Sequence, residues 1–228
     1  AKGRYGHRRI HRALGNTGCR VAKKTVLARM RTLGLTCQVR RRKRWTSYRG
    51  EVGTTAPNVL NRVFDATAPN QKWVTDVTEV RIGEEKLYVS PVMDLFDRQI
   101  IAYTLGRSPN LELTASALRQ ALVSLPPGAQ PLVHSDQGFQ YQHRSWQALL
   151  AQAGATPSMS RKGNCLDNAV IESFFGHLKS ELLLERFPTI DALETAVHAY
   201  IHWYNHERTS APLQGLSPVQ YRTQACLT

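Results

Sequence analysis

The segment RKGNCLDNAVIESFFGHLKSE, residues 161–181, contains the helix around which the rest of the chain can be interpreted. A Gly-Asn turn comes first, and the apolar pattern predicts a helix that begins near Asn168. Glu172 follows Asn168 by four residues and precedes Lys179 by seven. Spacings of four and seven return to nearly the same side of an α-helix, so an amide, a carboxylate and an ammonium group share one face. Glu172 is therefore a candidate metal ligand.

Strand and helix patterns alternate on both sides of this segment. Strands are predicted at residues 72–82, 87–95, 99–105, 131–135 and 156–160, and helices at residues 111–125, 143–153 and 190–207. Three strands joined by short turns, followed by alternating helices and strands, indicate an α/β protein with a five-stranded mixed sheet flanked by helices. The ribonuclease-H-like fold has this order of elements.

Two further acids, Asp76 and Asp136, lie in WVTDVTEV and LVHSDQGFQY, within or at the end of the predicted first and fourth strands. If these strands are neighbours, as the ribonuclease-H-like order requires, both carboxylates come together at the middle of the sheet, where they can meet Glu172. Close carboxylates are costly unless a cation neutralises them. Mg²⁺ or Mn²⁺ suits such ligands, and two ions ~3.5–4 Å apart can support an in-line displacement at phosphorus.

Two neighbouring residues have roles that the sequence leaves open. His134 lies two residues before Asp136 and shares its face of the strand. It is a candidate for ligating the metal ion or for orienting Asp136, and the alternative is a hydrogen bond inside the sheet. Asp167 is expected to cap the helix that carries Glu172.

Charge is distributed unevenly along the 228 residues, whose net charge is +13. Residues 1–50 contain sixteen Lys or Arg and no acid, whereas residues 51–228 carry a net charge of −3. A strongly basic first fifth on a nearly neutral body is typical of a nucleic-acid-binding segment attached to another domain. The alternative is a basic surface that only aids solubility.

Two short helices are predicted in the basic segment, at residues 5–14 and 22–33, around a Gly-containing turn. This arrangement indicates a helix-turn-helix, with Lys23 and Lys24 as candidate DNA contacts. A run of five basic residues follows, and it suits either a solvated linker or an arm that follows the DNA backbone. The residues of this run are Arg40, Arg41, Arg42, Lys43 and Arg44.

Several stretches together resemble one known family. TDVTEV, HSDQGFQY, SRKGNCLDNAVIESFFGHLKSE and YNHERTSAPLQGLSPVQY are similar to the integrase-core transposases of bacterial insertion sequences. The catalytic polypeptide of these proteins commonly comes from two overlapping reading frames, of which this chain resembles the second-frame product. YGHRRIH resembles the helix-turn-helix that precedes their retroviral-integrase-like core. The match runs from about Tyr5 to Tyr221, with thirty-five residues between the second and third acids.

The resemblance assigns roles to the residues already singled out. It implies that Asp76, Asp136 and Glu172 form a DDE triad that coordinates Mg²⁺ or Mn²⁺, as two ions. It also implies that Lys179 contacts the transposon-end DNA. Four more candidate DNA contacts lie at the start of the predicted helix or in the turn before it: Asn168, Arg161, Lys162 and Asn164. For Arg161 and Lys162 the alternative is that their charge only keeps the surface soluble.

The reaction implied is cleavage of a DNA strand followed by strand transfer from the freed 3′-OH. The partners implied are the terminal repeats of the mobile element, target DNA, further copies of the chain and an upstream-frame polypeptide. A bacterial cytoplasmic location at the nucleoid is expected. Two alternatives stay open: a ribonuclease-H-like nuclease that only cleaves, and an inactive DNA-binding fragment or repressor.

These inferences define four expected segments. A helix-turn-helix occupies residues 1–47, a linker residues 48–68 with a short helix around residues 58–64, a catalytic core residues 69–222, and a tail residues 223–228. Four separated cysteines without a C-x-x-C pair argue against a zinc knuckle. No apolar run approaches the ~18–20 residues that cross a bilayer, so no membrane partner is expected. The chain begins at Ala1 rather than Met, which is compatible with an upstream portion.

Overall fold

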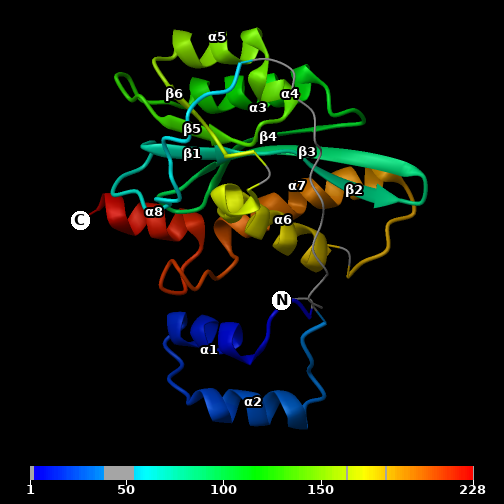
Figure 1. The fold of residues 1–228 in the computed structure, drawn as a ribbon. Helices are drawn as coiled ribbons and strands as arrows, with labels where there is room; N and C mark the ends of the chain where they lie inside the picture. Colours follow the sequence, from blue (N-terminus) through cyan, green and yellow to red (C-terminus); the bar gives the residue numbers. More distant parts are fainter. Residues whose placement is uncertain (1–2, 39–53, 163, 183, 228) are drawn as a thin grey trace. The chain divides into compact units, whose positions relative to one another are not determined.

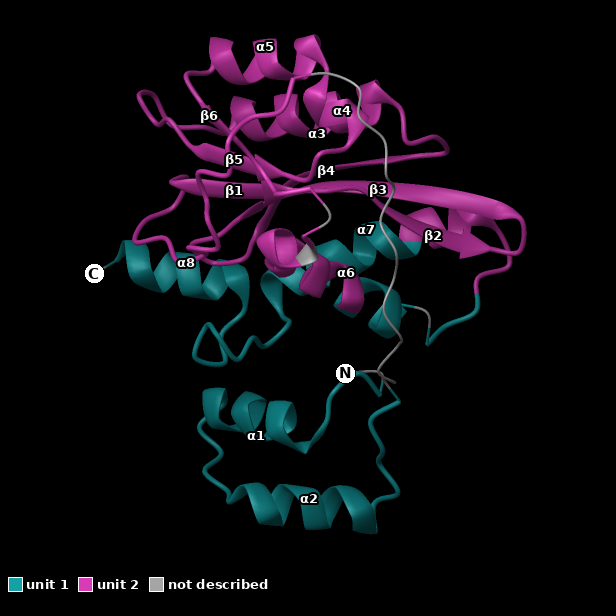
Figure 2. Cartoon of the chain, in the orientation of Figure 1, with its two compact units in different colours: residues 1–43, 177–186, 196–228 teal, residues 44–176, 187–195 magenta. Residues whose placement is uncertain are grey.

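The computed structural model of the protein describes residues 3–38, 54–162, 164–182 and 184–227 (Figure 1). The predicted basic arm lies outside the described residues: Arg40, Arg41, Arg42, Lys43 and Arg44. The chain forms two compact units (Figure 2). Unit 1 comprises residues 1–43, 177–186 and 196–228, and unit 2 comprises residues 44–176 and 187–195. The predicted segments follow one another along the chain, whereas these units interleave.

Unit 2 is built on a mixed sheet. Its strands are β1 Lys72–Thr75, β2 Thr78–Ile82, β3 Glu85–Asp94, β4 Ile100–Gly106, β5 Leu132–Ser135 and β6 Thr156–Met159. β3 pairs antiparallel with β1, β2 and β4, while β1 pairs parallel with β5 and β5 pairs parallel with β6. This topology confirms the predicted α/β class and its mixed sheet.

The predicted first strand is interrupted at Asp76 and Val77, so the sheet has six strands where five were expected. β1 and β2 nevertheless continue a single register along β3. In that register Asp76 stands opposite Pro91, the residue of β3 that has no N–H to donate. The two short strands therefore occupy the position of one predicted strand, and Asp76 lies at the break between them.

Helices cover the sheet and supply the core of unit 2. The helical segments that lie wholly in unit 2 are α3 Leu111–Val123, α4 Phe139–Gln142, α5 Arg144–Gln152 and the 3₁₀ turn η1 Cys165–Asn168. α3, α4 and α5 lie on one face of the sheet (Figure 1). The apolar residues of α3 and α5 pack against Trp73 and Val133 of the sheet and bury Trp146. α4 was not predicted because its four residues are too few to show a helical period.

The linker forms no helix over residues 58–64, contrary to the sequence-based expectation. Asn61 and Arg62 adopt positive φ angles of 42° and 63°, which a right-handed helix excludes. The backbone N–H groups of Val59 and Leu60 instead donate to the Ser158 hydroxyl at 3.0 and 3.1 Å. The linker is thus held against β6 by side-chain hydrogen bonds.

Unit 1 contains the predicted helical pair, as α1 His7–Asn16 and α2 Lys23–Thr32. α6 Ala169–Leu182 and α7 Ile190–His206 begin in unit 2 and end in unit 1. α8 Pro218–Cys226 was missed, although its capping box, in which Ser217 and Gln220 exchange hydrogen bonds, is readable in the sequence. Among the described residues no helix is both long and apolar enough to cross a membrane.

A buried carboxylate joins the helices of unit 1. Glu181 of α6 accepts hydrogen bonds from Arg9 of α1 at 3.0 Å, from Arg208 at 2.8 and 3.0 Å, and from the Tyr200 hydroxyl at 3.0 Å. Burial by itself raises the pKa of Glu181, but the Arg208 and Arg9 guanidinium groups outweigh it and lower the pKa to about 2. The first helix of the chain is thereby tied to α6 and α7.

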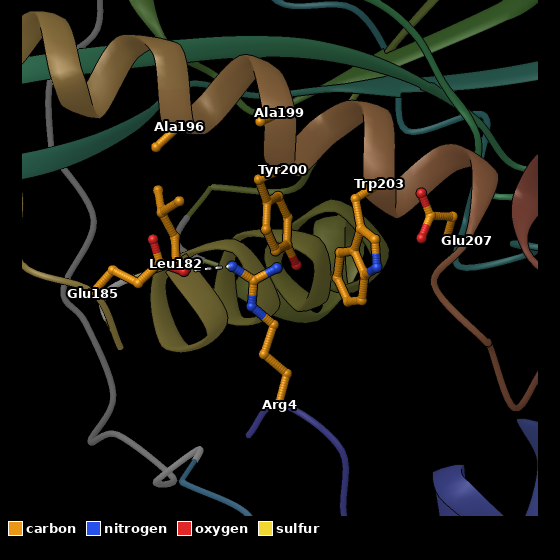
Figure 3. Close-up of a pocket in the computed structure, with 8 residues that line it drawn as sticks. All are labelled: Arg4, Leu182, Glu185, Ala196, Ala199, Tyr200, Trp203 and Glu207. Carbon is orange, nitrogen blue, oxygen red and sulfur yellow. Dashed lines mark ion pairs between the residues drawn. The ribbon is translucent and has the colours of Figure 1, made fainter. Parts of the chain in front are cut away.

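A cavity of about 400 Å³ also lies within unit 1. Figure 3 shows the Arg4 side chain extending into it beside the rings of Tyr200 and Trp203. The Arg4 guanidinium lies 5.6 and 5.0 Å from these ring centroids and 3.6 Å from the Glu185 carboxylate. An arginine of the same chain thus lines and partly fills the cavity, and none of the three predicted metal ligands lines it.

Candidate active site

Asp76 and Asp136 follow directly after two paired strands. β1 and β5 run parallel, with Trp73 opposite Val133 and Val74 opposite His134. The same offset of sixty residues places Asp76 beside Asp136 at the carboxyl ends of both strands. In open α/β sheets this edge is where ligands usually bind.

The charges of both aspartates act on one buried phenol. Burial, followed by the charges of Asp76 and Asp136, raises the pKa of Tyr141 well above its usual value. Its hydroxyl lies near the Thr75 and Ser90 side chains but forms no hydrogen bond of normal geometry with any described residue. Asp76 and Asp136 therefore both lie close enough to Tyr141 for their charges to act on its hydroxyl, and we call these three residues one neighbourhood.

Glu172 is the third acid of this neighbourhood. It lies in the first turn of α6, where its side chain is exposed. Although the residue as a whole is exposed, its carboxyl group is partly shielded from solvent, and this shielding and the charge of Asp136 both raise the pKa of Glu172. Burial also raises the pKa of Asp136, against the lowering effect of the Gly138 N–H. No Lys or Arg in the described part of the chain pairs with either acid.

The three carboxylates suit a hard divalent cation in chemistry, because they are oxygen ligands and because the charge of Asp136 disfavours the charge of Glu172. The three carboxylates do not converge on one point, however. Within residues 3–38, 54–162, 164–182 and 184–227, no three Asp, Glu, His or Cys side chains lie close enough together to hold a metal ion.

Asn168, four residues before Glu172, is buried with 4% of its surface exposed. Neither the oxygen nor the nitrogen of its amide has a hydrogen-bond partner among the described residues. A buried amide without partners costs about 1–3 kcal/mol. This amide lies at the start of the helix that carries Glu172.

His134 does not support Asp136 in the way that the sequence suggested. Its ring nitrogens contact the hydroxyls of Ser158 and Ser160, at 2.9 and 3.1 Å, and the ring is fully buried. Burial lowers the pKa of His134 to about 4, so the ring is neutral at pH 7. Because both nitrogens are engaged, the alternative of a hydrogen bond inside the sheet is the correct one.

Asp167 does not cap α6, because its carboxylate is bound elsewhere. It accepts hydrogen bonds from Arg161 at 2.8 and 2.9 Å, from Arg62 at 2.7 Å and from Asn58 at 2.9 Å. The Arg161 guanidinium, chiefly, lowers the pKa of Asp167. Arg161, a predicted DNA contact, forms an internal ion pair with Asp167, while Arg62 and Asn58 join the linker to η1.

The other candidate DNA contacts are distributed over both units. Lys23 and Lys24 are exposed at the start of α2, and Lys179 lies in the last turns of α6, within unit 1. In unit 2, Lys162 is exposed, and the Asn164 side chain accepts a hydrogen bond from the Leu166 N–H at 3.2 Å. Asn164 therefore has a local structural role at the start of η1.

Comparison with protein families gives matches over most of the chain. Residues 66–165 and 172–226 match two models of the integrase core domain, and residues 1–43 match an HTH-like domain. The chain is 50% identical over 224 residues to InsK, named as a transposase of insertion sequence element IS150, from Escherichia coli (strain K12). This match covers 98% of the chain and 79% of InsK.

A transposase-like protein of Haemophilus influenzae is 51% identical over 207 residues, which cover 90% of this chain and 95% of that protein. Among solved structures, the integrase catalytic core domain of HTLV-2 in complex with magnesium matches with a TM-score of 0.55 and 20% identity. That match covers 68% of this chain and 98% of the other, and it supports the ribonuclease-H-like fold. The chain therefore belongs to the insertion-sequence transposases with an integrase core, a family of DDE-type polynucleotidyl transferases.

Proposed function

We propose that this transposase binds the ends of its mobile element and catalyses metal-dependent cleavage of DNA strands and strand transfer from a 3′-OH. The observation that carries the proposal is the register of β1 and β5, which brings Asp76 and Asp136 to adjacent strand ends. Glu172, whose carboxyl group experiences the charge of Asp136, completes the acidic set. The three acids are the ligands that we assign to Mg²⁺ or Mn²⁺.

Divalent ions, when bound, supply positive charge that activates an attacking oxygen and stabilises a leaving one. The chemistry of the ligands supports this assignment, as does the magnesium complex of the HTLV-2 integrase core. Asp76 and Asp136 provide two oxygen ligands at adjacent strand ends, and Glu172 provides the third from α6. We assign two ions to the site, as the family resemblance implies.

Two displacements at phosphorus follow from this assignment. In the first, water breaks a phosphodiester at the element's end and leaves a free 3′-OH. In the second, that 3′-OH attacks another phosphodiester, forming one P–O bond as another breaks. The protein supplies no nucleophile, so its contribution is to position the DNA and to neutralise charge.

The DNA-binding contribution is assigned to both units. The helix-turn-helix of α1 and α2 presents Lys23 and Lys24, and the basic arm follows it in the sequence. Asn168 has an amide without internal partners, and we assign it, with Lys179, to the transposon-end DNA. Joining two ends needs protein at both, so we expect a homo-oligomer on DNA in the bacterial cytoplasm, together with an upstream-frame polypeptide.

The deciding experiment compares the full chain with the Glu172→Gln variant on labelled transposon ends in Mg²⁺ or Mn²⁺. The substitution keeps the shape of the side chain and removes its charge. We expect both nicking and joining to fall by at least about 100-fold, on the scale of losing one electrostatic stabiliser, with DNA binding retained.

Glu84→Gln is the matched control, because Glu84 is an exposed acid in the turn between β2 and β3. Unchanged strand transfer in Glu172→Gln excludes Glu172 as the third ligand. Cleavage without joining by the unmodified protein favours a plain nuclease over a transposase.

A further inference from the structure

The turn after Asp136 contains a glycine that its backbone conformation does not require. Gly138 has φ −62° and ψ 149°, an extended conformation that any amino acid adopts without strain. An explanation for glycine at this position has to come from its surroundings.

Space is what distinguishes the position. A Cβ atom at Gly138 would lie 2.9 Å from Asp136 Oδ1, 2.9 Å from Gln140 Oε1 and 3.4 Å from Tyr141 Cδ2. A Cβ atom essentially never approaches a non-bonded oxygen to within 3.0 Å, so any side chain here forces a neighbour to move. Because glycine has only a hydrogen in place of Cβ, the Asp136 carboxylate can occupy this space.

Two of the three neighbours are held in place. Gln140 has 7% of its surface exposed, and its amide donates to the Pro109 carbonyl at 3.0 Å. Tyr141 has 1% exposed and packs edge-on against Trp146, with 4.9 Å between ring centroids. The partly exposed carboxylate of Asp136 is the neighbour that can move most readily.

The turn as a whole is also braced. The Gln137 amide donates to the Ser160 carbonyl at 3.0 Å, and the Gln142 amide donates to the Gln137 carbonyl. Ser160 directly follows β6, so these bonds tie the turn to the neighbouring strand. The backbone is therefore unable to retreat and absorb an added methyl group.

We propose that Gly138 is a positioning residue for Asp136. Its N–H donates to Asp136 Oδ1 at 2.9 Å, and its lack of a side chain lets that oxygen sit between the turn and Gln140. Together these features hold the carboxylate in its observed position, from which it would bind a divalent cation together with Asp76. This inference rests on the proposed function, because it assumes that Asp136 is a metal ligand.

The expected consequence of Gly138→Ala is a folded protein with a displaced ligand. Both colliding atoms are ends of side chains, and Asp136 is the less buried of the two residues, so its carboxylate takes up most of the displacement while the sheet is retained. Because Asp136 turns away, we expect the dissociation constant for Mn²⁺ to rise about 10- to 100-fold, the range seen when groups that orient a ligand are altered. The half-maximal Mg²⁺ concentration for DNA cleavage should rise in parallel.

The experiment titrates Mn²⁺ into the full chain and follows free Mn²⁺ by electron paramagnetic resonance, with thermal unfolding measured on the same samples. Gly15→Ala is the control, because nothing lies within 4 Å of a Cβ added there. It should leave Mn²⁺ affinity unchanged. Asp136→Asn tests the proposed function itself and should abolish tight binding.

The outcomes separate the two ideas. Wild-type affinity in folded Gly138→Ala, with binding lost in Asp136→Asn, overturns the positioning role and leaves the proposed function intact. Wild-type affinity in Asp136→Asn overturns both. If Gly138→Ala does not fold, Gly138→Ala/Gln140→Ala removes one of the two collisions, and the same comparison decides.

Discussion

Asp136 is an acid whose surroundings oppose its charge. It is partly buried, it has no basic partner among the described residues, and burial raises its pKa. Functional sites commonly keep such groups at a cost in stability, since the charge serves binding rather than folding. Gly138 illustrates the same balance, because the space that it leaves serves the carboxylate rather than the packing.

We predict that Asp136→Asn raises the Tm of the metal-free protein at pH 7. Asparagine keeps an oxygen to accept the Gly138 N–H and removes a charge that burial disfavours. A gain of a few degrees is expected, because 1 kcal/mol corresponds to about 2–4 °C for a chain of this size. Thermal scans in the presence of a chelator measure it.

Asp94→Asn is the contrasting variant. The Asp94 carboxylate is buried and accepts the backbone N–H groups of Asn70 and Phe96 at 2.8 and 3.0 Å, so it serves folding. Its substitution should lower Tm. A fall in Tm for Asp136→Asn as large as that for Asp94→Asn contradicts the functional interpretation of the Asp136 charge.

The 3₁₀ turn η1, which leads into α6, is held in place by contacts with the linker. Asp167 of η1 binds Arg62 and Asn58, which come from more than a hundred residues earlier in the chain. Arg161 closes the same cluster from the turn before η1. The start of the helix that carries Glu172 is thereby fixed to unit 2 through a buried carboxylate.

We predict that Asp167→Asn lowers the free energy of unfolding by about 1–3 kcal/mol, because it removes charge-assisted hydrogen bonds around a buried group. The arginine partners are 40% and 53% exposed, which keeps the loss below that of a fully buried pair. Urea unfolding measures the change. Asp65→Asn, at an exposed acid of the same linker, should stay within about 0.5 kcal/mol of wild type.

At the level of the whole molecule, the chain does not divide at a single boundary. The N-terminal helices belong to the same compact unit as the ends of α6 and α7, with Glu181 at their junction. Family matching instead follows the chain in order, with its first boundary after residue 43. Loss of the Glu181 charge should therefore destabilise unit 1 as a whole.

We predict that Glu181→Gln destabilises the protein by about 3–5 kcal/mol at pH 7, because the buried Arg208 loses its counter-charge. The pKa of Glu181 is lowered from 4.5 to about 2, so its stabilising effect is complete above pH 4.5 and is lost as the pH falls toward 2. The difference between wild type and variant should shrink over that interval. Unfolding followed at several pH values checks this.

The control for Glu181 is Glu185→Gln. Glu185 pairs with Arg4 at 3.6 Å but has 42% of its side chain exposed, so about 1 kcal/mol or less is expected. A constant difference between wild type and Glu181→Gln from pH 7 to pH 2 contradicts the assigned ion pair.

The amino-acid sequence by itself determined the α/β class, most of the strands and helices, and the three acids with their spacing. These features are local: a strand repeats every two residues and a helix every 3.6, so the pattern can be read without knowing what packs against it. The basic N-terminal helices were readable for the same reason. α8 was readable too, through Ser217 and Gln220, but it was missed.

Only the tertiary structure decided how the site is assembled. The break opposite Pro91, the neutral His134 between two serines, the commitment of Arg161 to Asp167 and the space above Gly138 all depend on partners distant in the sequence. Strand pairing and helix packing select those partners. A local pattern carries no record of which strand lies alongside, so the surroundings of Asp136 and Glu172 emerge only from the folded chain.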